Sequence, residues 1–138
     1  MIKIKHFLIL LAVFIGLTAC VGESTGVTTE APSDGVEVLY FHGRQRCLTC
    51  RAIEKEAKEV VDSLNNADVH FRVIDITAPE NQALADRYEI TWSSLVLVKY
   101  DDGKEKAENV TQFAFANARS NPAQFKKELA AKINQMLK

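Results

Sequence analysis

Two cysteines separated by two residues are the part of this sequence best suited to chemistry. Cys47 and Cys50 form a C-x-x-C arrangement. Zinc sites also use this spacing, but a tetrahedral structural site needs two further ligands. The only other cysteine is Cys20, and after it the only histidines are His42 and His70. In an exported protein, a lone pair at this spacing is typical of a redox-active dithiol or disulfide, so we expect that chemistry rather than zinc binding.

Export is indicated by the N-terminus. Residues 1–6 carry two lysines and no acidic residue, and the 13 residues 7–19 are apolar or small. This run is shorter than the roughly 18 to 20 residues of a membrane-spanning helix, so residues 1–19 are predicted to be a signal peptide. Residues 17–20, LTAC, resemble the lipobox of bacterial lipoproteins. The resemblance implies that Cys20 is acylated and becomes the first residue of the mature protein. An ordinary signal peptide followed by a chance cysteine is the alternative.

Lipid on Cys20 would hold the protein at a membrane surface, because each buried CH₂ group contributes about 0.8 kcal/mol and more than one acyl chain makes anchoring stable. We therefore expect it in the bacterial cell envelope, on the periplasmic side or at the outer membrane. Removal of the first 19 residues leaves 119, the size of one domain. Both removed charges are lysines, so 15 basic and 18 acidic side chains remain and the net charge is −3. A net negative charge does not favour binding to nucleic acid, which needs a positively charged surface.

The mature chain is predicted to begin with a linker. Residues 20–34 are rich in Gly, Ser, Thr, Glu and Pro. Such a segment has little to bury, which predicts a flexible tether from the lipidated Cys20, although part of it could pair as an edge strand. The domain itself is expected at residues 35–138.

The residues around the cysteines predict a strand followed by a helix. Residues 36–41, VEVLYF, are rich in residue types that favour strands. The segment ends in consecutive apolar residues, which is typical of a central strand buried on both faces rather than of a half-exposed one. Apolar residues then recur at helical spacing, so a helix is expected from about residue 48 to residue 64, with the cysteines at its start. Asn65-Asn66 is its expected stop. Glu54 and Lys58 are expected to form an i,i+4 ion pair on its exposed side.

The rest of the chain predicts three further strands and two helices. Strands are expected at residues 69–76, 95–98 and about 104–110, with a hairpin turn at 101–103. Pro79 opens a short helix that ends near Tyr88, and Asn121-Pro122 caps a C-terminal helix. The order β-α-β-α-β-β-α predicts an α/β fold with a mixed four-stranded sheet flanked by helices, parallel at its start and antiparallel at its end.

This order, combined with the position of the C-x-x-C pair, resembles the thioredoxin-like superfamily. The resemblance covers about residues 36–138. It rests on a buried strand that ends in an aromatic pair, a short loop, the two cysteines at a helix start, and a basic residue after the second cysteine. The remaining elements follow the same family pattern. The resemblance implies a central mixed sheet between helices and a thiol–disulfide oxidoreductase activity.

Helix geometry then assigns roles to the two cysteines. Cys47 is expected at the helix mouth facing water, whereas Cys50 lies three residues before Ile53 on the buried side. Cys47 is therefore the expected attacking thiolate, and Cys50 the resolving thiol. The helix N-terminus is expected to lower the pKa of Cys47, helped by three nearby arginines, Arg44, Arg46 and Arg51.

Two features depart from the thioredoxin-like pattern. Thioredoxins commonly carry a buried aspartate in the strand before the cysteines, but residues 38–41 contain no carboxylate. Glu54, Glu56 or water would have to accept the proton of the resolving cysteine instead. Ser94 occupies the position of the usual cis-proline. The peptide bond before it is expected to be trans, because a cis bond before a non-proline residue costs about 2.5–4 kcal/mol. Trp92, close by, is expected either to cover the dithiol or to cap the core.

The leading hypothesis is a monomeric thiol–disulfide oxidoreductase of the cell envelope that needs no cofactor. Its partners would be protein or small thiols and disulfides and an unidentified redox partner. A serine in place of the proline would open the dithiol to a soft metal such as Cu(I), so a copper-type binding or delivery module using Cys47, Cys50 and His42 is one alternative. His42 is otherwise structural or an acid/base, and His70 is expected to be structural. The other alternative is a non-catalytic interaction domain in which the disulfide is a staple, although so short a loop gains little stability from it.

Overall fold

The structure is a computed structural model that describes residues 33–138. The expected signal peptide, the lipidation site Cys20 and the tether as far as residue 32 lie outside the described residues. Within residues 33–138, no helix is both long enough and apolar enough to cross a membrane.

Four strands form one mixed sheet. Its strands are β1 (Gly35–His42), β2 (Val69–Asp75), β3 (Ser94–Asp101) and β4 (Lys104–Asn109), arranged in the order β2-β1-β3-β4. β1 runs parallel to β2 and antiparallel to β3, and β3 runs antiparallel to β4. The predicted α/β fold class, with a parallel start and an antiparallel finish, is confirmed.

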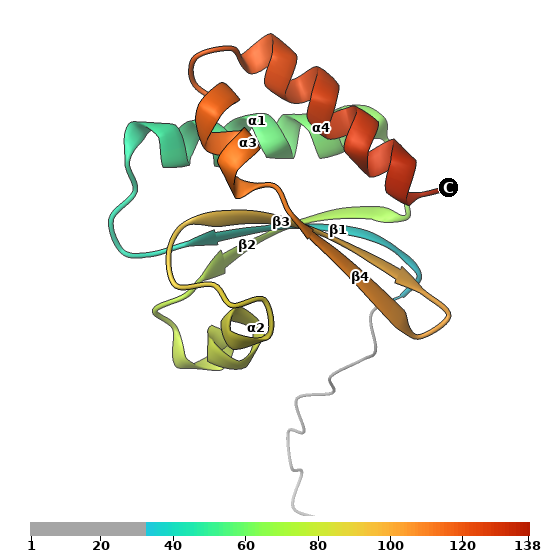
Figure 1. The fold of residues 1–138 in the computed structure, drawn as a ribbon, viewed down its shortest axis with the longest axis horizontal. Coiled ribbons are helices and arrows are strands. Elements are labelled where there is room, and N and C mark those ends of the chain that lie inside the picture. Colours follow the sequence, from blue (N-terminus) through green and yellow to red (C-terminus); the bar gives the residue numbers. More distant parts are fainter. Residues whose placement is uncertain (1–32) are drawn as a thin grey trace, which may run out of the picture. The chain divides into compact units, whose positions relative to one another are not determined.

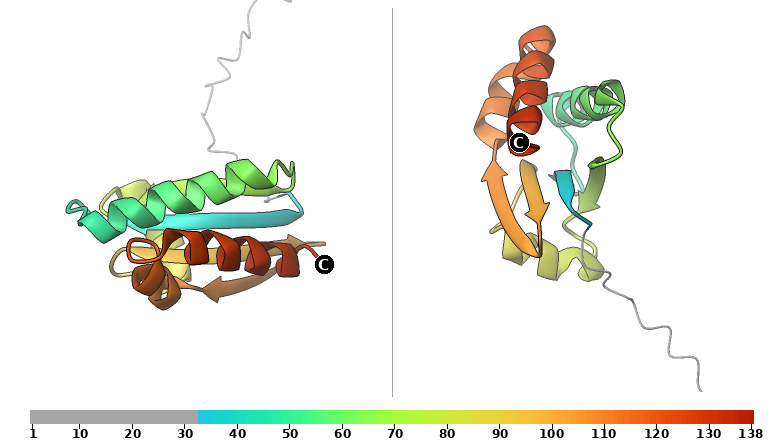
Figure 2. Two further views of the ribbon diagram at one scale, coloured as in Figure 1. Left: turned by 90° about the horizontal axis from the view of Figure 1, so that it is seen from above. Right: turned by 90° about the vertical axis from the view of Figure 1, so that its right-hand side faces the viewer.

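Helices cover both faces of this sheet. They are α1 (Leu48–Leu64), α2 (Gln82–Arg87) with a 3-10 turn (Pro79–Asn81) before it, α3 (Thr111–Asn117) and α4 (Pro122–Met136). α1, α3 and α4 lie over one face and α2 lies over the other (Figure 1). Seen from above and from the side, α1 and α4 run next to each other across the sheet (Figure 2).

The alternation of side chains along β1 divides the core in two. Val36, Val38 and Tyr40 point into the cluster under α1, α3 and α4, whereas Leu39 and Phe41 point into the cluster over α2. All five side chains are buried, because successive residues of a central strand face opposite, covered sides of the sheet. β1 therefore forms a rigid base for the loop that carries the cysteines.

Helix α1 begins and ends where the sequence predicts. Asn65 closes it in the left-handed conformation with φ of 46°, a geometry that asparagine tolerates better than most residues. The predicted ion pair between Glu54 and Lys58 is wrong. The Glu54 carboxylate binds Arg46 of the preceding loop, and Lys58 pairs with Asp62 instead.

Helix α3 is the one element that the sequence did not predict. It is seven residues long and begins directly after β4, without a side-chain hydrogen bond from its N-cap residue Val110. Thr111 ties this junction to β3: the Leu95 amide donates to the Thr111 hydroxyl at 2.9 Å, and both residues are buried. α3 thus lies at the end of the sheet where β3 begins.

Candidate active site

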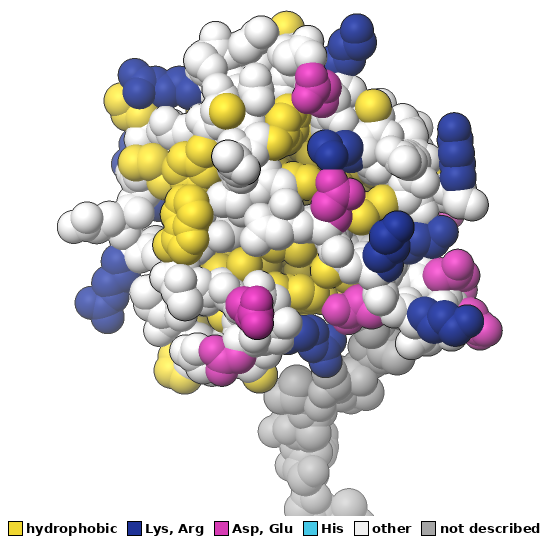
Figure 3. Space-filling view, in the orientation of Figure 1, with side chains coloured by type: hydrophobic (Ala, Val, Ile, Leu, Met, Phe, Trp, Pro, Cys, Tyr) yellow, Lys and Arg dark blue, Asp and Glu magenta, His cyan; other side chains and the backbone are white. Residues whose placement is uncertain are grey.

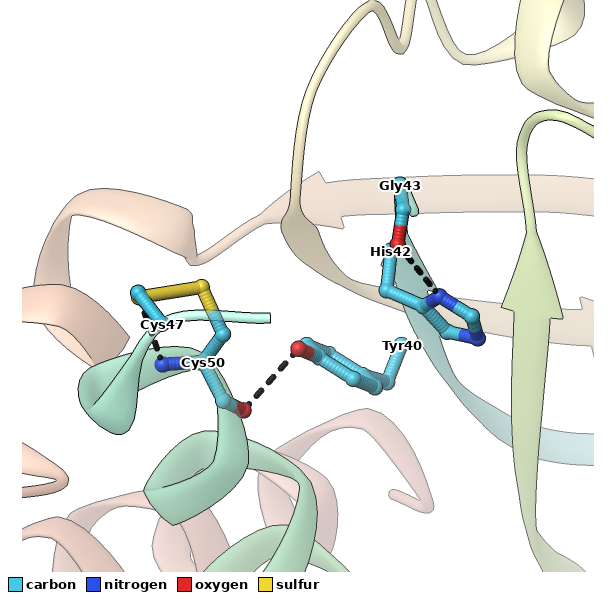
Figure 4. Close-up of a disulfide and its surroundings, with 5 residues drawn as sticks. All are labelled: Tyr40, His42, Gly43, Cys47 and Cys50. Carbon is cyan, nitrogen blue, oxygen red and sulfur yellow. Dashed lines mark hydrogen bonds between the residues drawn. A yellow bond between two sulfur atoms is a disulfide. The ribbon is translucent and has the colours of Figure 1, made fainter. Parts of the chain in front are cut away.

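Cys47 and Cys50 are joined by a disulfide at the N-terminus of α1. Their Cα atoms are 5.0 Å apart, within the range that a disulfide spans. Cys47 is exposed to solvent, while Cys50 is only 5% exposed and faces the core. The predicted placement of one outer and one inner sulfur is therefore present in the structure (Figure 4).

The sulfur of Cys47 also caps the helix. Cys47 is the N-cap residue of α1, and the backbone N–H of Cys50 donates to its Sγ at 3.0 Å. The first N–H groups of a helix have no partner within the helix and carry partial positive charge. A thiolate formed at Cys47 would meet this charge directly, which favours its ionised form.

Tyr40 of β1 lies beneath the disulfide. Its side chain is fully buried, and its hydroxyl donates to the backbone carbonyl of Cys50 at 2.9 Å (Figure 4). Burial, and then the nearby Glu54 carboxylate, raise the pKa of Tyr40, with Arg46 and Ser93 opposing the shift in part. The phenol is therefore protonated at neutral pH and able to donate.

The three arginines near the cysteines differ in their surroundings. Arg46 is half-buried and its guanidinium lies 2.6 Å from the Glu54 carboxylate, so its charge is partly neutralised. Arg44 and Arg51 are exposed. Arg44 contributes, together with His42, to lowering the pKa of Asp75, although the hydrogen bonds from Thr77 are the main cause. The positive end of α1 is thus the charge that Cys47 contacts most directly.

Comparison with known proteins identifies the fold. No protein-family model matches this sequence, and no curated protein matches it. Solved structures do match: the solution structure of a thioredoxin from Thermus thermophilus aligns with a TM-score of 0.50 and 19% identity over 71% of this chain and 73% of that one. The fold is thioredoxin-like.

Two further structures are similar. The crystal structure of Trxlp from Edwardsiella tarda EIB202 aligns with a TM-score of 0.47 and 14% identity, over 72% of this chain and 85% of that one. The crystal structure of the Trx4 domain of ERdj5 aligns with a TM-score of 0.48 and 15% identity, over 73% of this chain and 85% of that one. A thioredoxin-like fold with a C-x-x-C pair at a helix start supports a thiol–disulfide oxidoreductase type of function.

Ser94 begins β3 at the end of the thioredoxin-like sheet from which the cysteine loop departs, since it pairs with Phe41 near the end of β1. Its side chain is buried, and its hydroxyl donates to the carbonyl of Trp92 at 3.0 Å. The peptide bond before Ser94 is trans, as predicted, because residues 33–138 contain no cis peptide bond.

Trp92 does not cap the core. It is 57% exposed, and its ring lies against Phe115 of α3 with the ring centroids 5.3 Å apart. Both rings line a groove of about 470 Å³, together with Ser94, Thr111 and Gln112. Apolar side chains gather on the face shown in Figure 3, over α3 and the segment before β3. Sequence reasoning missed Phe115 because α3 itself was not predicted.

The two histidines lie outside the dithiol site. The Nδ1 atom of His42 is 3.0 Å from the carbonyl oxygen of Gly43, and Figure 4 shows Tyr40 between the His42 ring and the disulfide. His70 is exposed on β2. Among residues 33–138, no group of three His, Cys, Asp or Glu side chains is arranged to hold a metal ion.

The two glutamates named as possible bases also have other partners. Glu54 is bound to Arg46. Glu56 is buried between α1 and α4, where Lys126 lies 2.8 Å and Lys55 lies 2.7 Å from its carboxylate oxygens. Glu56 therefore belongs to the contact between the helices rather than to the dithiol site.

Proposed function

We propose that this domain is a thiol–disulfide oxidoreductase in which Cys47 exchanges with a partner and Cys50 resolves the intermediate. The observation that supports this most strongly is the asymmetry of the disulfide. Cys47 is open to solvent and capped by a helix N–H, and Cys50 is buried directly behind it. An attacking thiol needs access and a stabilised thiolate, and a resolving thiol needs to be held nearby.

The reaction balances with these two residues alone. In the reducing direction the Cys47 thiolate attacks a partner disulfide, forms a mixed disulfide, and releases the first partner sulfur as a thiolate that takes up a proton. Cys50 then gives its proton to water and attacks the Cys47 sulfur, which releases the second partner sulfur. Two electrons pass from the dithiol to the partner, and the reverse sequence oxidises a dithiol.

The surface near the cysteines suits a protein partner. Leu48, between the two cysteines, is 65% exposed, and Trp92 at the groove is 57% exposed. Exposed large apolar side chains are typical of interaction sites. We propose that the groove beside Trp92 and Phe115 contacts polypeptide around the partner cysteine, and that the domain acts as a monomer.

The location of this activity is the second part of the proposal. The lipobox-like residues 17–20 support lipidation of Cys20, and the composition of residues 20–34 supports a tether between lipid and domain. The domain would then work at a membrane surface of the cell envelope. Cys20→Ser should release the protein into the soluble envelope fraction and remove the mass of the acyl chains, while a wild-type chain of unmodified mass would contradict lipidation.

The exchange function is tested by disulfide reduction. Residues 21–138, supplied with dithiothreitol, should reduce insulin, and Cys47→Ser should abolish this turnover. Cys50→Ser should accumulate a mixed disulfide through Cys47. Tight stoichiometric Cu(I) binding without turnover would instead favour metal delivery, and neither activity would leave an interaction domain; both results contradict the proposal.

A further inference from the structure

Within residues 33–138, a polar side chain of the sheet, Tyr40, is joined to the cysteine turn. It lies near the C-terminal end of β1, where its register partners are Val73 of β2 and Leu95 of β3. Its hydroxyl reaches the Cys50 carbonyl across the core, and the ring is completely buried. A side chain fixed in a central strand keeps its position when the loop and helix start above it change state.

We propose that Tyr40 is a positioning residue for the resolving step: its hydroxyl holds the Cys50 carbonyl, so that the Cys50 thiol stays behind Cys47 after the disulfide has opened. This inference rests on the proposed exchange function. Residues 38–41 of β1 contain no carboxylate, and the neutral phenol of Tyr40 lies in this stretch instead. The phenol positions Cys50 and does not act as a base.

The protonation state of Tyr40 fits this role. A backbone carbonyl only accepts hydrogen bonds, so the phenol must be the donor. The pKa of Tyr40 is raised, first by burial and then by the Glu54 carboxylate, so the hydroxyl keeps its proton at the pH at which thiols exchange. The hydroxyl is therefore available as a donor at that pH.

The hydrogen bond acts on both cysteines through one peptide group. The carbonyl of Cys50 and the N–H of Arg51 belong to the same peptide unit, and that N–H donates to the Cys47 carbonyl at 3.1 Å. Hydrogen bonds on the two sides of a peptide polarise one another. Tyr40 thus fixes the first turn of α1 by a chain of contacts that does not depend on the disulfide.

The two chemical steps should depend differently on this contact. The first attack uses an exposed sulfur, stabilised by the helix N-terminus. The second step requires the free Cys50 thiol to remain close to Cys47 and aligned with it, and losing that alignment lowers its effective concentration. Removing the hydroxyl should therefore slow resolution and leave the first attack almost unchanged.

The test compares Tyr40→Phe with wild type in the full chain purified in detergent. Formation of a mixed disulfide with a thionitrobenzoate-linked peptide reports the first attack in a Cys50→Ser background. Release of the peptide in the presence of Cys50 reports resolution. We expect Tyr40→Phe to leave the first rate within about twofold and to slow the second roughly three- to tenfold, the range expected for loss of one hydrogen bond.

The redox equilibrium of the Cys47–Cys50 pair is a second measurement, and a purely structural role of Tyr40 would not change it. The equilibrium constant for closing the disulfide against glutathione should fall by the same three- to tenfold factor in Tyr40→Phe, because it contains the effective concentration of Cys50. The matched control is Tyr88→Phe. It also removes a tyrosine hydroxyl, which lies 3.2 Å from that of Tyr100 in the cluster over α2, and it should change neither rate nor equilibrium.

The outcomes separate this inference from the proposed function. Absence of mixed disulfide in wild type would defeat the exchange function itself, whereas normal exchange with equal resolution rates in wild type and Tyr40→Phe would overturn only the role of Tyr40. A measurement on the wild-type protein does not depend on the variant folding. The ¹³C shift of the Cys50 carbonyl should be nearly the same in the oxidised and reduced protein, and a shift that reports loss of the hydroxyl contact on reduction would overturn the inference.

Discussion

At the residue scale, the environment of Cys47 is set more by the helix than by the arginines around it. The Cys50 N–H contacts the Cys47 sulfur at 3.0 Å, while the guanidinium of Arg46 is held by Glu54. The sequence indicates three cations near the dithiol, but it does not show that one of them is paired with a carboxylate eight residues later. Pairing reduces the field of Arg46 at the sulfur.

This arrangement predicts how the thiolate responds to mutation. The apparent pKa of Cys47 in the reduced protein should lie below the roughly 8.5 of a free thiol. Glu54→Gln should lower it further, because the released Arg46 charge then favours the thiolate. The measurement is the rate of alkylation by iodoacetamide as a function of pH, with Cys50→Ser to isolate the signal.

The control for this prediction is Glu80→Gln, which removes an exposed carboxylate beside α2 on the other face of the sheet. It should leave the Cys47 titration unchanged. A Cys47 pKa at or above that of a free thiol, or a higher value in Glu54→Gln, would show that the helix and Arg46 do not act on the sulfur in this way.

At the element scale, α1 is held in place by α4 as well as by the sheet. Glu56 of α1 is buried at this contact, with Lys126 of α4 2.8 Å away and Lys55 of α1 2.7 Å away. Glu59 also pairs with Lys126. These ion pairs fix the helix whose first turn carries the disulfide.

The pairing at Glu56 predicts a loss of stability in acid. Hydrogen bonds from Lys126, and then from Lys55, lower the pKa of Glu56 from its ordinary value of 4.5, against the opposing effect of burial. A carboxyl group whose pKa is lower in the folded than in the unfolded protein stabilises the fold when the pH is above the unfolded-state pKa. This stabilisation is lost as the pH falls through the folded-state pKa. Glu56→Gln should cost about 1–2 kcal/mol at pH 7, and less in acid.

Urea unfolding at pH 7 and at pH 3 measures this difference. The comparison variant is Asp62→Asn, which breaks the exposed pair between Asp62 and Lys58 on the same helix and should cost little at either pH. An equal cost of Glu56→Gln at both values of pH would mean that the charge of Glu56 does not stabilise the helix contact.

The elements with strong local patterns could be predicted from the sequence. α1 begins at Leu48 and ends at Leu64, as its apolar periodicity and Asn65-Asn66 indicate, and Asn121 caps α4 through its side chain. α3 was not found in the same way, because it is short and its N-cap residue Val110 has no capping side chain. The side-chain carbonyl oxygen of Asn109 does accept a hydrogen bond from the Thr111 N–H at 3.0 Å, but Asn109 belongs to the strand before the helix. A helix this short needs tertiary contacts to form, such as the hydrogen bond from the Leu95 N–H to the Thr111 hydroxyl.

The same limit applies to the candidate site. Positions of the cysteines follow from spacing alone, whereas the Tyr40 contact depends on how far α1 lies above the sheet. One signal was available: Tyr40 shares its strand face with Val36 and Val38, which alternation places under the helix. The pairing of Arg46 with Glu54 and the contact of Trp92 with Phe115 depend on loop paths that no short-range pattern specifies.

At the scale of the whole molecule, one thioredoxin-like domain exposes Cys47 to solvent and keeps Cys50 buried behind it. Under the proposed function, a partner sulfur needs access to Cys47 only, because Cys50 is buried and its carbonyl is bound by Tyr40. This division of roles distinguishes a working dithiol from a disulfide that merely closes a short loop, which contributes little entropic stability.

A redox titration tests this central claim most directly. The protein is equilibrated with glutathione buffers of defined ratio or with dithiothreitol, its thiols are trapped with acid and alkylated, and the reduced fraction is measured by mass. We predict a reversible two-electron transition of Cys47 and Cys50 with a midpoint between about −270 and −120 mV, the range of known exchange proteins. A pair that stays oxidised below about −300 mV, or that does not interconvert at all, would contradict the account.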